Sequence, residues 1–183
     1  MNADFNPDFE SLKNNIIEVI EEEQIKLGFR EETIRLYYPM ESLNHLLGAE
    51  LSMNELLDAL NRFCIYVKKY LGDVAYSYKD TRFCMIIPPS GASYVHANTG
   101  DKSFLKEFIE RISTCHGTIE DILTVFRNYS DRVKCEKMSG EDFDYLIYFE
   151  DEKPDAYRYC IKFEGDHTIY HRFTKADYDS FGF

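Results

Sequence analysis

Cysteine and histidine supply the side chains of this sequence that are best able to act as nucleophiles, bases or metal ligands. The chain holds five of each. No two cysteines form a Cys-x-x-Cys pair, so their pattern predicts neither a zinc site nor a redox motif. Their odd number argues against a disulfide framework, and we expect most of them to be small core residues of a reduced protein. The cysteines are Cys64, Cys84, Cys115, Cys135 and Cys160.

Cys160 and His171 lie on two neighbouring runs of alternating apolar and polar residues, which Gly165 and Asp166 separate. If these two residues form a two-residue hairpin loop, Cys160 faces His171, and a thiol beside an imidazole is the minimum arrangement for an activated thiolate. Glycine at the first loop position favours this register. The sequence shows neither a carboxylate to orient the histidine nor an oxyanion hole, so we assign the pair no catalytic role.

A bulged loop gives the same hairpin a different register. It places Phe163 opposite Ile169 and Tyr159 opposite Phe173, which gathers apolar side chains on one face. Because the buried face sets the register of a sheet, we favour this alternative slightly. From the sequence, the register of the Gly165-Asp166 hairpin stays open.

His167 and His171 have the spacing of a His-x-x-x-His metal pair. These residues lie in a predicted strand, where they are ~13 Å apart at ~3.3 Å per residue. One ion with bonds of ~2.1 Å cannot bridge them. We expect no metal site here, and we interpret Cys115-His116-Gly117 as a helix end, where a cationic histidine suits the helix dipole.

The stretch Ser90–Gly100 has no clear periodicity and is predicted to be a loop. It holds no glycine-rich phosphate-binding pattern and no Gly-x-Ser-x-Gly. Together with His96 it is the first place where we would look for a ligand. An enzyme would instead have to assemble its site from scattered polar residues, and those to follow are Arg35, Tyr37, Arg82 and His96.

Several carboxylates lie in predicted turns or near the carboxyl terminus. General acid–base catalysis needs a carboxyl group that is desolvated enough to shift its pKa, and solvated turn residues do not meet that condition. We therefore predict no catalytic residue, no metal and no cofactor. The residues concerned are Asp142, Asp144, Asp166, Asp177 and Asp179.

The net charge of −12 is unevenly distributed, since residues 1–60 carry 13 acidic and 4 basic side chains. No cluster of Lys and Arg is present to replace the counterions of a nucleic acid, and an anionic membrane would repel the chain. The amino-terminal residues lack the basic region and apolar core of a signal peptide, and no apolar run approaches the ~18 residues of a membrane span. We expect a cytoplasmic protein.

Four consecutive runs near the end of the chain alternate with a period of two, and turn residues separate them, which predicts an antiparallel meander. A further pair of runs earlier in the chain predicts a hairpin around Lys79-Asp80-Thr81, and Thr33–Tyr38 is either an edge strand or an extended linker. The meander runs are Val133–Met138, Phe143–Glu150, Tyr157–Glu164 and Thr168–Thr174, and the hairpin runs are Val74–Tyr78 and Arg82–Ile87.

Five segments have helical spacing and end signals. The strongest begins at Ser52, which forms a capping-box pair with Glu55, and ends at Gly72. The first opens with Asn6 as N-cap and Pro7 in the first turn, and it ends at Gly28. The other three are Ser42–Gly48, Ser103–Cys115 and Thr118–Tyr129.

Helices, a hairpin, helices and a meander in this order predict an α+β fold, because strands and helices do not alternate. We expect one domain over residues 1–183, in which an antiparallel sheet of about six strands has about five helices packed mainly on one face.

Three segments resemble a family of uncharacterised single-domain proteins, classified as a domain of unknown function and found mostly in anaerobic gut Gram-positive bacteria. The resemblance implies a bacterial, cytoplasmic setting, and it supplies no activity, cofactor or catalytic residue. The segments are Glu23–Gly28, Thr33–Pro39 and Ser42–Gly48.

Without a catalytic motif, the sequence favours a small non-enzymatic module that binds a protein or a small molecule. Tyr157, Tyr159 and Tyr170 could form a contact surface if exposed, although a sheet face covered by helices is the better expectation for them. The alternatives are an enzyme with a site of scattered residues, and an acidic decoy or immunity-type protein that binds a basic partner. The oligomeric state is unknown.

Overall fold

The computed structural model describes residues 7–99, 103–114, 116–140 and 142–181. These residues are divided between two compact units, 1–100 and 101–183, each of which has its own sheet. The α+β class is confirmed, as are the hairpin and the four-stranded meander. The strands form two antiparallel sheets instead of one sheet of about six, and the single domain over 1–183 stays a prediction.

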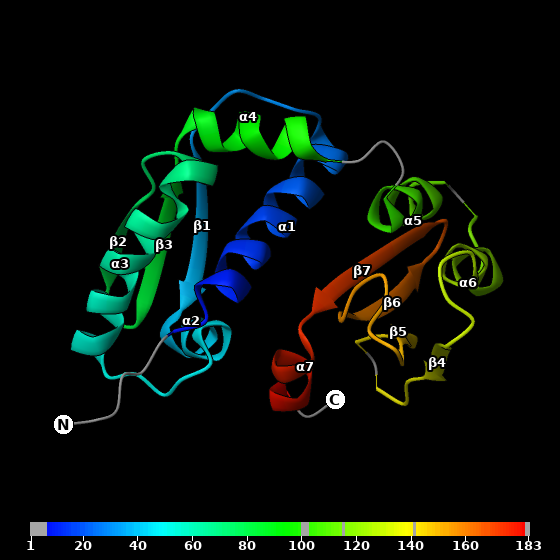
Figure 1. The fold of residues 1–183 in the computed structure, drawn as a ribbon. Coiled ribbons are helices and arrows are strands. Elements are labelled where there is room, and N and C mark those ends of the chain that lie inside the picture. Colours follow the sequence, from blue (N-terminus) through cyan, green and yellow to red (C-terminus); the bar gives the residue numbers. More distant parts are fainter. Residues whose placement is uncertain (1–6, 100–102, 115, 141, 182–183) are drawn as a thin grey trace. The chain divides into compact units, whose positions relative to one another are not determined.

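The described residues of the first unit form four helices and a three-stranded sheet of order β1-β3-β2 (Figure 1). Thr33–Tyr38 is thus an edge strand and not a linker, and it pairs with the second strand of the hairpin. Pro39 lies at the end of this edge strand, where the missing N–H costs little. The elements are α1 (Phe9–Leu27), β1 (Ile34–Pro39), α2 (Met40–Leu47), α3 (Met53–Leu71), β2 (Ala75–Lys79), β3 (Arg82–Ile87) and α4 (Pro89–Asn98).

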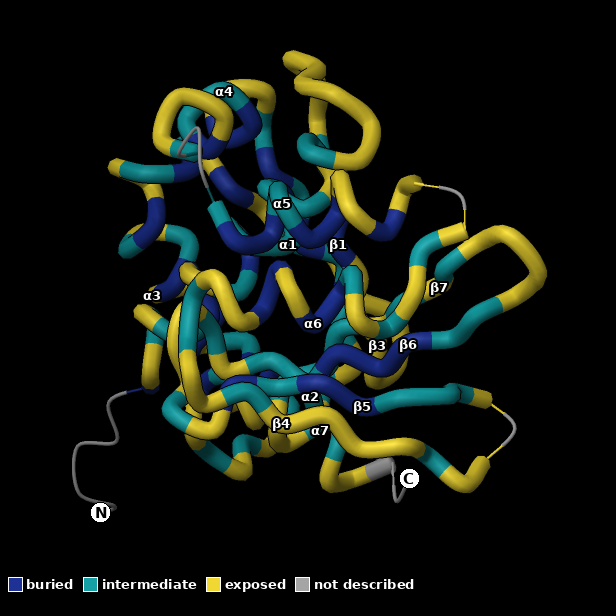
Figure 2. The backbone as a smooth tube through the Cα atoms, turned by 90° about the vertical axis from the view of Figure 1, so that its right-hand side faces the viewer, coloured by how far each residue is buried: buried dark blue, intermediate teal, exposed yellow. Residues whose placement is uncertain are grey.

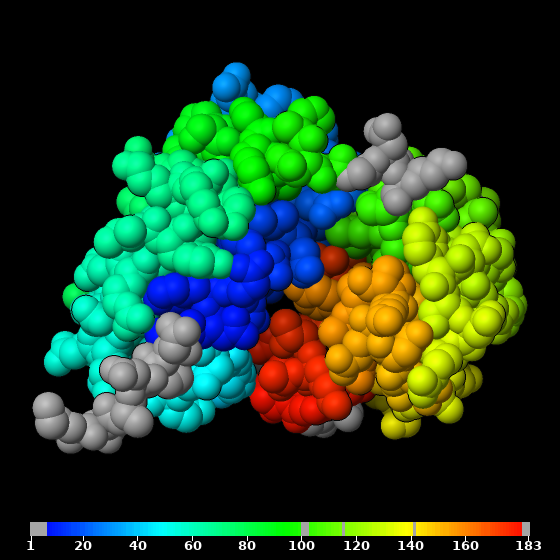
Figure 3. Space-filling view, in the orientation of Figure 1, coloured from blue at the N-terminus to red at the C-terminus, as the bar shows by residue number. Residues whose placement is uncertain are grey.

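Helices α1 and α3 cover one face of this sheet (Figure 1), and with α4 they make the side of the unit that faces the viewer in Figure 3. The buried side chains of the strands alternate with exposed ones, as a strand with one covered face requires. The helices contribute Leu12, Ile16, Leu60, Phe63 and Val67 to the core, and the strands contribute Leu36, Phe83, Met85 and Ile87.

The predicted ends of these helices hold in most cases. Ser52 and Glu55 form the expected capping box of α3, and Gly48 ends α2 in the left-handed conformation. The start of α1 differs from the prediction, because Asp8 is the N-cap and accepts a hydrogen bond from the backbone N–H of Ser11 at 2.9 Å. Asn6 lies outside the described residues.

Ser90–Gly100 was expected to be a loop, but helix α4 occupies Pro89–Asn98. Its buried face consists of Gly91, Ala92 and Val95, which are too small to produce a strong apolar period. The missed signal is Pro88-Pro89, since proline at the first helical position is favourable.

The second unit contains three helices and the meander, in the order β4-β5-β6-β7. Figure 2 shows the contrast between the buried central strands β5 and β6 and the exposed edge strand β4. With the four helices of the first unit, the described residues form seven helices instead of about five. The elements are α5 (Phe104–Ile112), α6 (Ile119–Arg127), β4 (Val133–Lys137), β5 (Tyr145–Phe149), β6 (Arg158–Glu164), β7 (His167–Phe173) and α7 (Lys175–Phe181).

Helix α7 was not predicted. Its signal is the pair Thr174 and Asp177, because the Thr174 hydroxyl donates to the Asp177 carboxylate at 2.7 Å and accepts from the Asp177 backbone N–H at 3.1 Å. This cap begins a helix directly after the last strand.

An aromatic cluster fills the space between α5, α6 and the sheet. The rings of Phe104, Phe108 and Phe126 make edge-to-face contacts with the fully buried Tyr159, at centroid distances of 5.0–5.7 Å. Such contacts add ~0.5–1.5 kcal/mol per pair beyond burial. Tyr159 and the half-buried Tyr170 therefore belong to a sheet face covered by helices, and an exposed tyrosine surface does not form here.

The buried hydroxyl of Tyr159 has a carboxylate partner. It donates a hydrogen bond to Asp155 Oδ2 at 2.6 Å, and the backbone N–H of Tyr157 donates to Asp155 Oδ1 at 3.1 Å. Burial raises the pKa of Asp155, although these hydrogen bonds and Arg172 act in the opposite direction. The folded protein therefore binds a proton at this position more tightly than the unfolded chain does.

The close packing of α4 yields a first prediction. A Cβ on Gly91 would lie 2.5 Å from Ile87 Cγ2 and 2.7 Å from the carbonyl oxygen of Leu71, so Gly91→Ala forces α4 away from both β3 and α3. Overpacking costs about 1–3 kcal/mol, which exceeds the ~1 kcal/mol that alanine gains in an open helix. Urea unfolding of Gly91→Ala should show reduced stability, and Gly140→Ala, with open space at its Cβ, should change little.

A second prediction follows from the raised pKa of Asp155. A raised folded pKa favours folding at low pH, and this contribution is lost as pH rises from the ordinary aspartate pKa of 3.8 through the folded pKa. Asp155→Asn removes the titration and keeps an acceptor for Tyr159, so its stability relative to the native protein should increase over that pH range. Thermal unfolding at several pH values measures this.

Two controls accompany that experiment. Asp131→Asn neutralises an exposed aspartate and should show no such trend. Asp155→Ala leaves the buried Tyr159 hydroxyl without its acceptor and should cost about 1–3 kcal/mol. A stability difference between Asp155→Asn and the native protein that does not change with pH would contradict the prediction.

Candidate functional site

Cys160 and His171 face each other across β6 and β7, so the register is that of the two-residue loop. The slightly favoured bulged register is wrong, and the structure pairs Ile161 with Tyr170 instead. Glycine at the first loop position, with a φ of +59°, decided the register, because this conformation suits a tight hairpin turn. The apolar residues need not gather on one face, since side chains are buried on both faces of β6.

The thiol and the imidazole in this pair have separate environments. Cys160 is completely buried, and burial raises the pKa of its thiol to about 11. The ring of His171 packs against Phe143 and Phe173 at centroid distances of 5.5 and 6.0 Å. A buried thiol with a raised pKa is a poor nucleophile, so the geometry gives this pair a packing role.

The structure also gives the positions of other candidate histidines. Among the described residues, no group of His, Cys, Asp and Glu has a geometry that could hold a metal ion. His116 Nδ1 lies 3.0 Å from Asp166 Oδ1, and both side chains are exposed. Cys115 lies outside the described residues. His96 is on α4, where its ring stacks on Phe29 at 4.1 Å.

Three of the five carboxylates considered for acid–base chemistry have structural partners instead, and Asp179 is exposed on α7. Asp144 accepts a hydrogen bond from the backbone N–H of Phe163 at 2.7 Å, which holds the turn before β5 against β6. Asp177 caps α7 and Asp166 contacts His116. Asp142 differs from these, because it lines a cavity.

Three of the four residues singled out as a scattered polar set do lie together. Arg35 and Tyr37 alternate with Leu36 on β1, and the register pairs Tyr37 with Cys84 and Pro39 with Arg82. Since the face of Leu36 is buried, Arg35, Tyr37 and Arg82 all belong to the opposite face of the sheet. His96 is not part of this face.

We call this surface the outer face. It spans all three strands of the sheet. On β1 it includes the exposed Arg35 and Tyr37, on the central strand β3 the half-buried Cys84 and Ile86, and on β2 exposed residues. The full set is Arg35, Tyr37, Pro39, Ala75, Ser77, Lys79, Arg82, Cys84 and Ile86.

The outer face differs in charge from the rest of the chain. It carries three cations, Arg35, Lys79 and Arg82, and no acidic residue, although the whole protein has a net charge of −12. Among the ion pairs of the described residues, none involves these three side chains. Tyr37 is 73% exposed, which is unusual for a large aromatic ring and places an apolar surface beside the cations.

The sequence did not reveal this cluster, because its cations are far apart along the chain. Arg35 and Arg82 become neighbours only through the pairing of β1 with β3. The alternation along Thr33–Tyr38 predicts that Arg35 and Tyr37 point to the same face of a sheet. It does not predict which strand pairs with this one.

The fold and the outer face define a small α+β protein whose described residues show an exposed basic sheet surface and no catalytic constellation. The chain belongs to the DUF3877 family, a domain of unknown function described from E. rectale, whose model matches residues 9–182. The resemblance proposed from the sequence is thereby confirmed. Comparisons with curated proteins and with solved structures found no match.

No helix among the described residues has both the length and the apolar composition that a membrane crossing requires. The described cysteines Cys64, Cys84, Cys135 and Cys160 are all free thiols.

The burial of Cys160 predicts the order in which these thiols react. In the folded protein at about pH 8, iodoacetamide should modify the exposed Cys135 and leave Cys160 unmodified, because both access and the thiolate population are low at Cys160. Peptide mass spectrometry after timed alkylation gives the extent at each position, and the unfolded chain in urea should react at both. Alkylation of Cys160 below about pH 8 would show that the thiol is activated.

Proposed function

We propose that this protein is a non-enzymatic binding module that recognises an acidic segment of a partner protein through its outer face. The observation that supports the proposal is the cluster of Arg35, Lys79 and Arg82 on an uncovered sheet face of an otherwise acidic chain.

Charge complementarity argues for an acidic partner. Opposite potentials speed up association and exclude partners of the wrong sign, and the effect is largest for side chains that have no ion pair of their own. The net charge of −12 repels an acidic segment and the cations of the outer face attract it, so the charge distribution favours binding at this face.

The outer face also has the composition of a contact surface. Binding energy in protein interfaces is concentrated in arginine and aromatic residues near the centre, and here Tyr37 lies on the strand of Arg35 and opposite Cys84. The half-buried Cys84 and Ile86 provide an apolar strip between the two edge strands. Arginine can bind a carboxylate through two parallel hydrogen bonds, which adds geometric selectivity.

The form of the surface supports binding over catalysis. An enzyme usually holds its polar residues in a concave site that excludes water. Arg35, Tyr37 and Arg82 lie on an open sheet, and the cavities described in the two units are lined by other residues. As part of the same proposal we place the protein in the bacterial cytoplasm, where its free thiols would remain reduced.

A charge-reversal experiment tests this function. The probe is a fluorescein-labelled peptide of alternating Glu and Phe, and binding is followed by fluorescence anisotropy at low salt. Arg35→Glu combined with Arg82→Glu should weaken binding by about tenfold or more, since both attractive contacts become repulsive. Raising the salt concentration should also weaken binding of the native protein, because exposed charges are screened.

The control is Arg62→Glu, which makes a single charge reversal on α3, the helix that packs on the opposite face of the sheet, and it is compared with Arg35→Glu and Arg82→Glu made singly as well as with the double variant. It should leave the affinity within about twofold of the native value, and circular dichroism checks that each variant is folded. Equal binding by the double variant and the control would refute the proposal. Tighter binding of a Lys-rich peptide of equal length would instead support the acidic decoy.

A further inference from the structure

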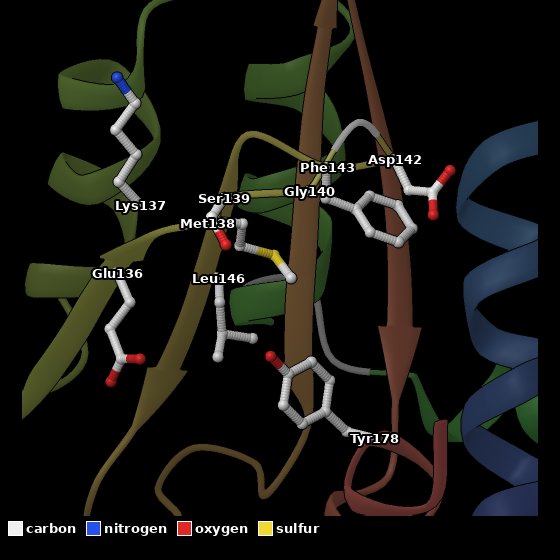
Figure 4. A pocket seen from close by; sticks show the side chains of 9 residues that line it. All are labelled: Glu136, Lys137, Met138, Ser139, Gly140, Asp142, Phe143, Leu146 and Tyr178. Carbon is white, nitrogen blue, oxygen red and sulfur yellow. The ribbon is translucent and has the colours of Figure 1, made fainter. Parts of the chain in front are cut away.

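A cavity of about 380 Å³ lies within the second unit, on the face of the sheet opposite to α5 and α6 (Figure 4). Its floor is formed by β4 and β5, and Tyr178 of α7 forms one wall. At one end of the cavity lie Ser139 and Gly140, next to the hydrogen bond that the backbone N–H of Met138 donates to the carbonyl of Asp144 at 2.9 Å. The volume is within the range of sites for small molecules.

The walls of the cavity are largely apolar and aromatic. Met138 and Leu146 lie along its floor, and the rings of Phe143 and Tyr178 stand beside them (Figure 4). Leu146 is buried, whereas Met138 and both rings are half-buried, so a ligand could cover apolar surface that is now in contact with water. Thioether and aromatic groups are polarisable and contact cations favourably.

The charges at the cavity are negative. Glu136 and Asp142 line it, and neither takes part in an ion pair among the described residues, although the Asp142 carboxylate points away from the other labelled side chains in Figure 4. Lys137 is the one cation among the lining residues, and its ammonium group points away from the other side chains in Figure 4. The alternation of β4 explains this, because neighbouring residues point to opposite faces.

The Glu136 carboxylate is held in place by a neutral partner. The hydroxyl of Tyr148 donates to Glu136 Oε1 at 3.1 Å, which fixes the carboxylate without cancelling its charge. The nearby guanidinium of Arg158 lies over the ring of Tyr148, 4.0 Å from its centroid. Burial and the charge of Glu136 raise the pKa of Tyr178, so its phenol is neutral at physiological pH. The cavity thus combines one fixed charge with apolar walls.

We propose that this cavity binds a small organic cation, an amine attached to an aromatic or similar apolar body. The ammonium group would lie at Glu136, and the apolar body would cover Met138 and Leu146 beside the rings of Phe143 and Tyr178. An anion of the same size is repelled by the Glu136 carboxylate, and a neutral analogue loses the charge interaction. This site is separate from the outer face and does not depend on the proposed function.

Three probes of matched size separate the contributions of charge and apolar contact: phenethylamine, 2-phenylethanol and phenylacetate. Each probe is titrated into the protein, and binding is followed by amide chemical shifts in NMR. The amine should bind, the alcohol should bind about tenfold more weakly than the amine, and phenylacetate should not bind. The amine should shift signals of residues that line the cavity.

Glu136→Gln removes the charge but keeps an acceptor for Tyr148. It should weaken phenethylamine binding by about tenfold and leave the alcohol unchanged. The matched control Glu150→Gln neutralises an exposed glutamate that pairs with Lys134 and does not line the cavity, and it should bind the amine normally. A folded Glu136→Gln variant with native affinity, or an alcohol that binds as tightly as the amine, would refute the assignment. The double variant Arg35→Glu, Arg82→Glu should bind phenethylamine with native affinity. Its result therefore distinguishes failure of the cavity proposal from failure of the outer-face proposal.

Discussion

The alternation of side chains along each strand is the constraint on which both surfaces of this protein depend. In the first unit, α1 and α3 bury Leu36 and Met85, and period-two geometry then forces Arg35 and Arg82 to the other face. Neither arginine needs a partner for folding, because the stability of the unit comes from the opposite face. The cations of the outer face remain available for binding for this reason.

The same constraint has a different outcome in the second unit. The aromatic cluster around Tyr159 occupies the face of β6 that α5 and α6 cover, and Cys160 therefore points to the other face. Helix α7 brings Tyr178 to that side of the sheet, and this helix explains how side chains can be buried on both faces of the central strands. Incomplete coverage by a short helix leaves the cavity beside Glu136.

Each proposed site holds charged side chains mainly of one sign, positive on the outer face and negative in the cavity. The outer face gathers cations within an acidic chain, and the cavity places carboxylates beside aromatic rings. In each case the charged groups lack an ion-pair partner among the described residues, so an external ligand can supply the missing charge without displacing an internal one.

The sequence by itself determined the α+β class, the hairpin, the meander and most helix ends, because period, capping residues and glycine stops act over a few neighbouring residues. It did not determine α4, because the buried face of that helix includes the small residues Gly91 and Ala92. It also did not determine α7, because the cap residue Thr174 is only a weak signal for the start of a helix. Only the tertiary structure decided that β1 pairs with β3, that the strands form two sheets, and that Tyr178 lies over β4 and β5. These contacts join residues that are distant in sequence, and no local pattern encodes which distant partner a strand or helix will meet.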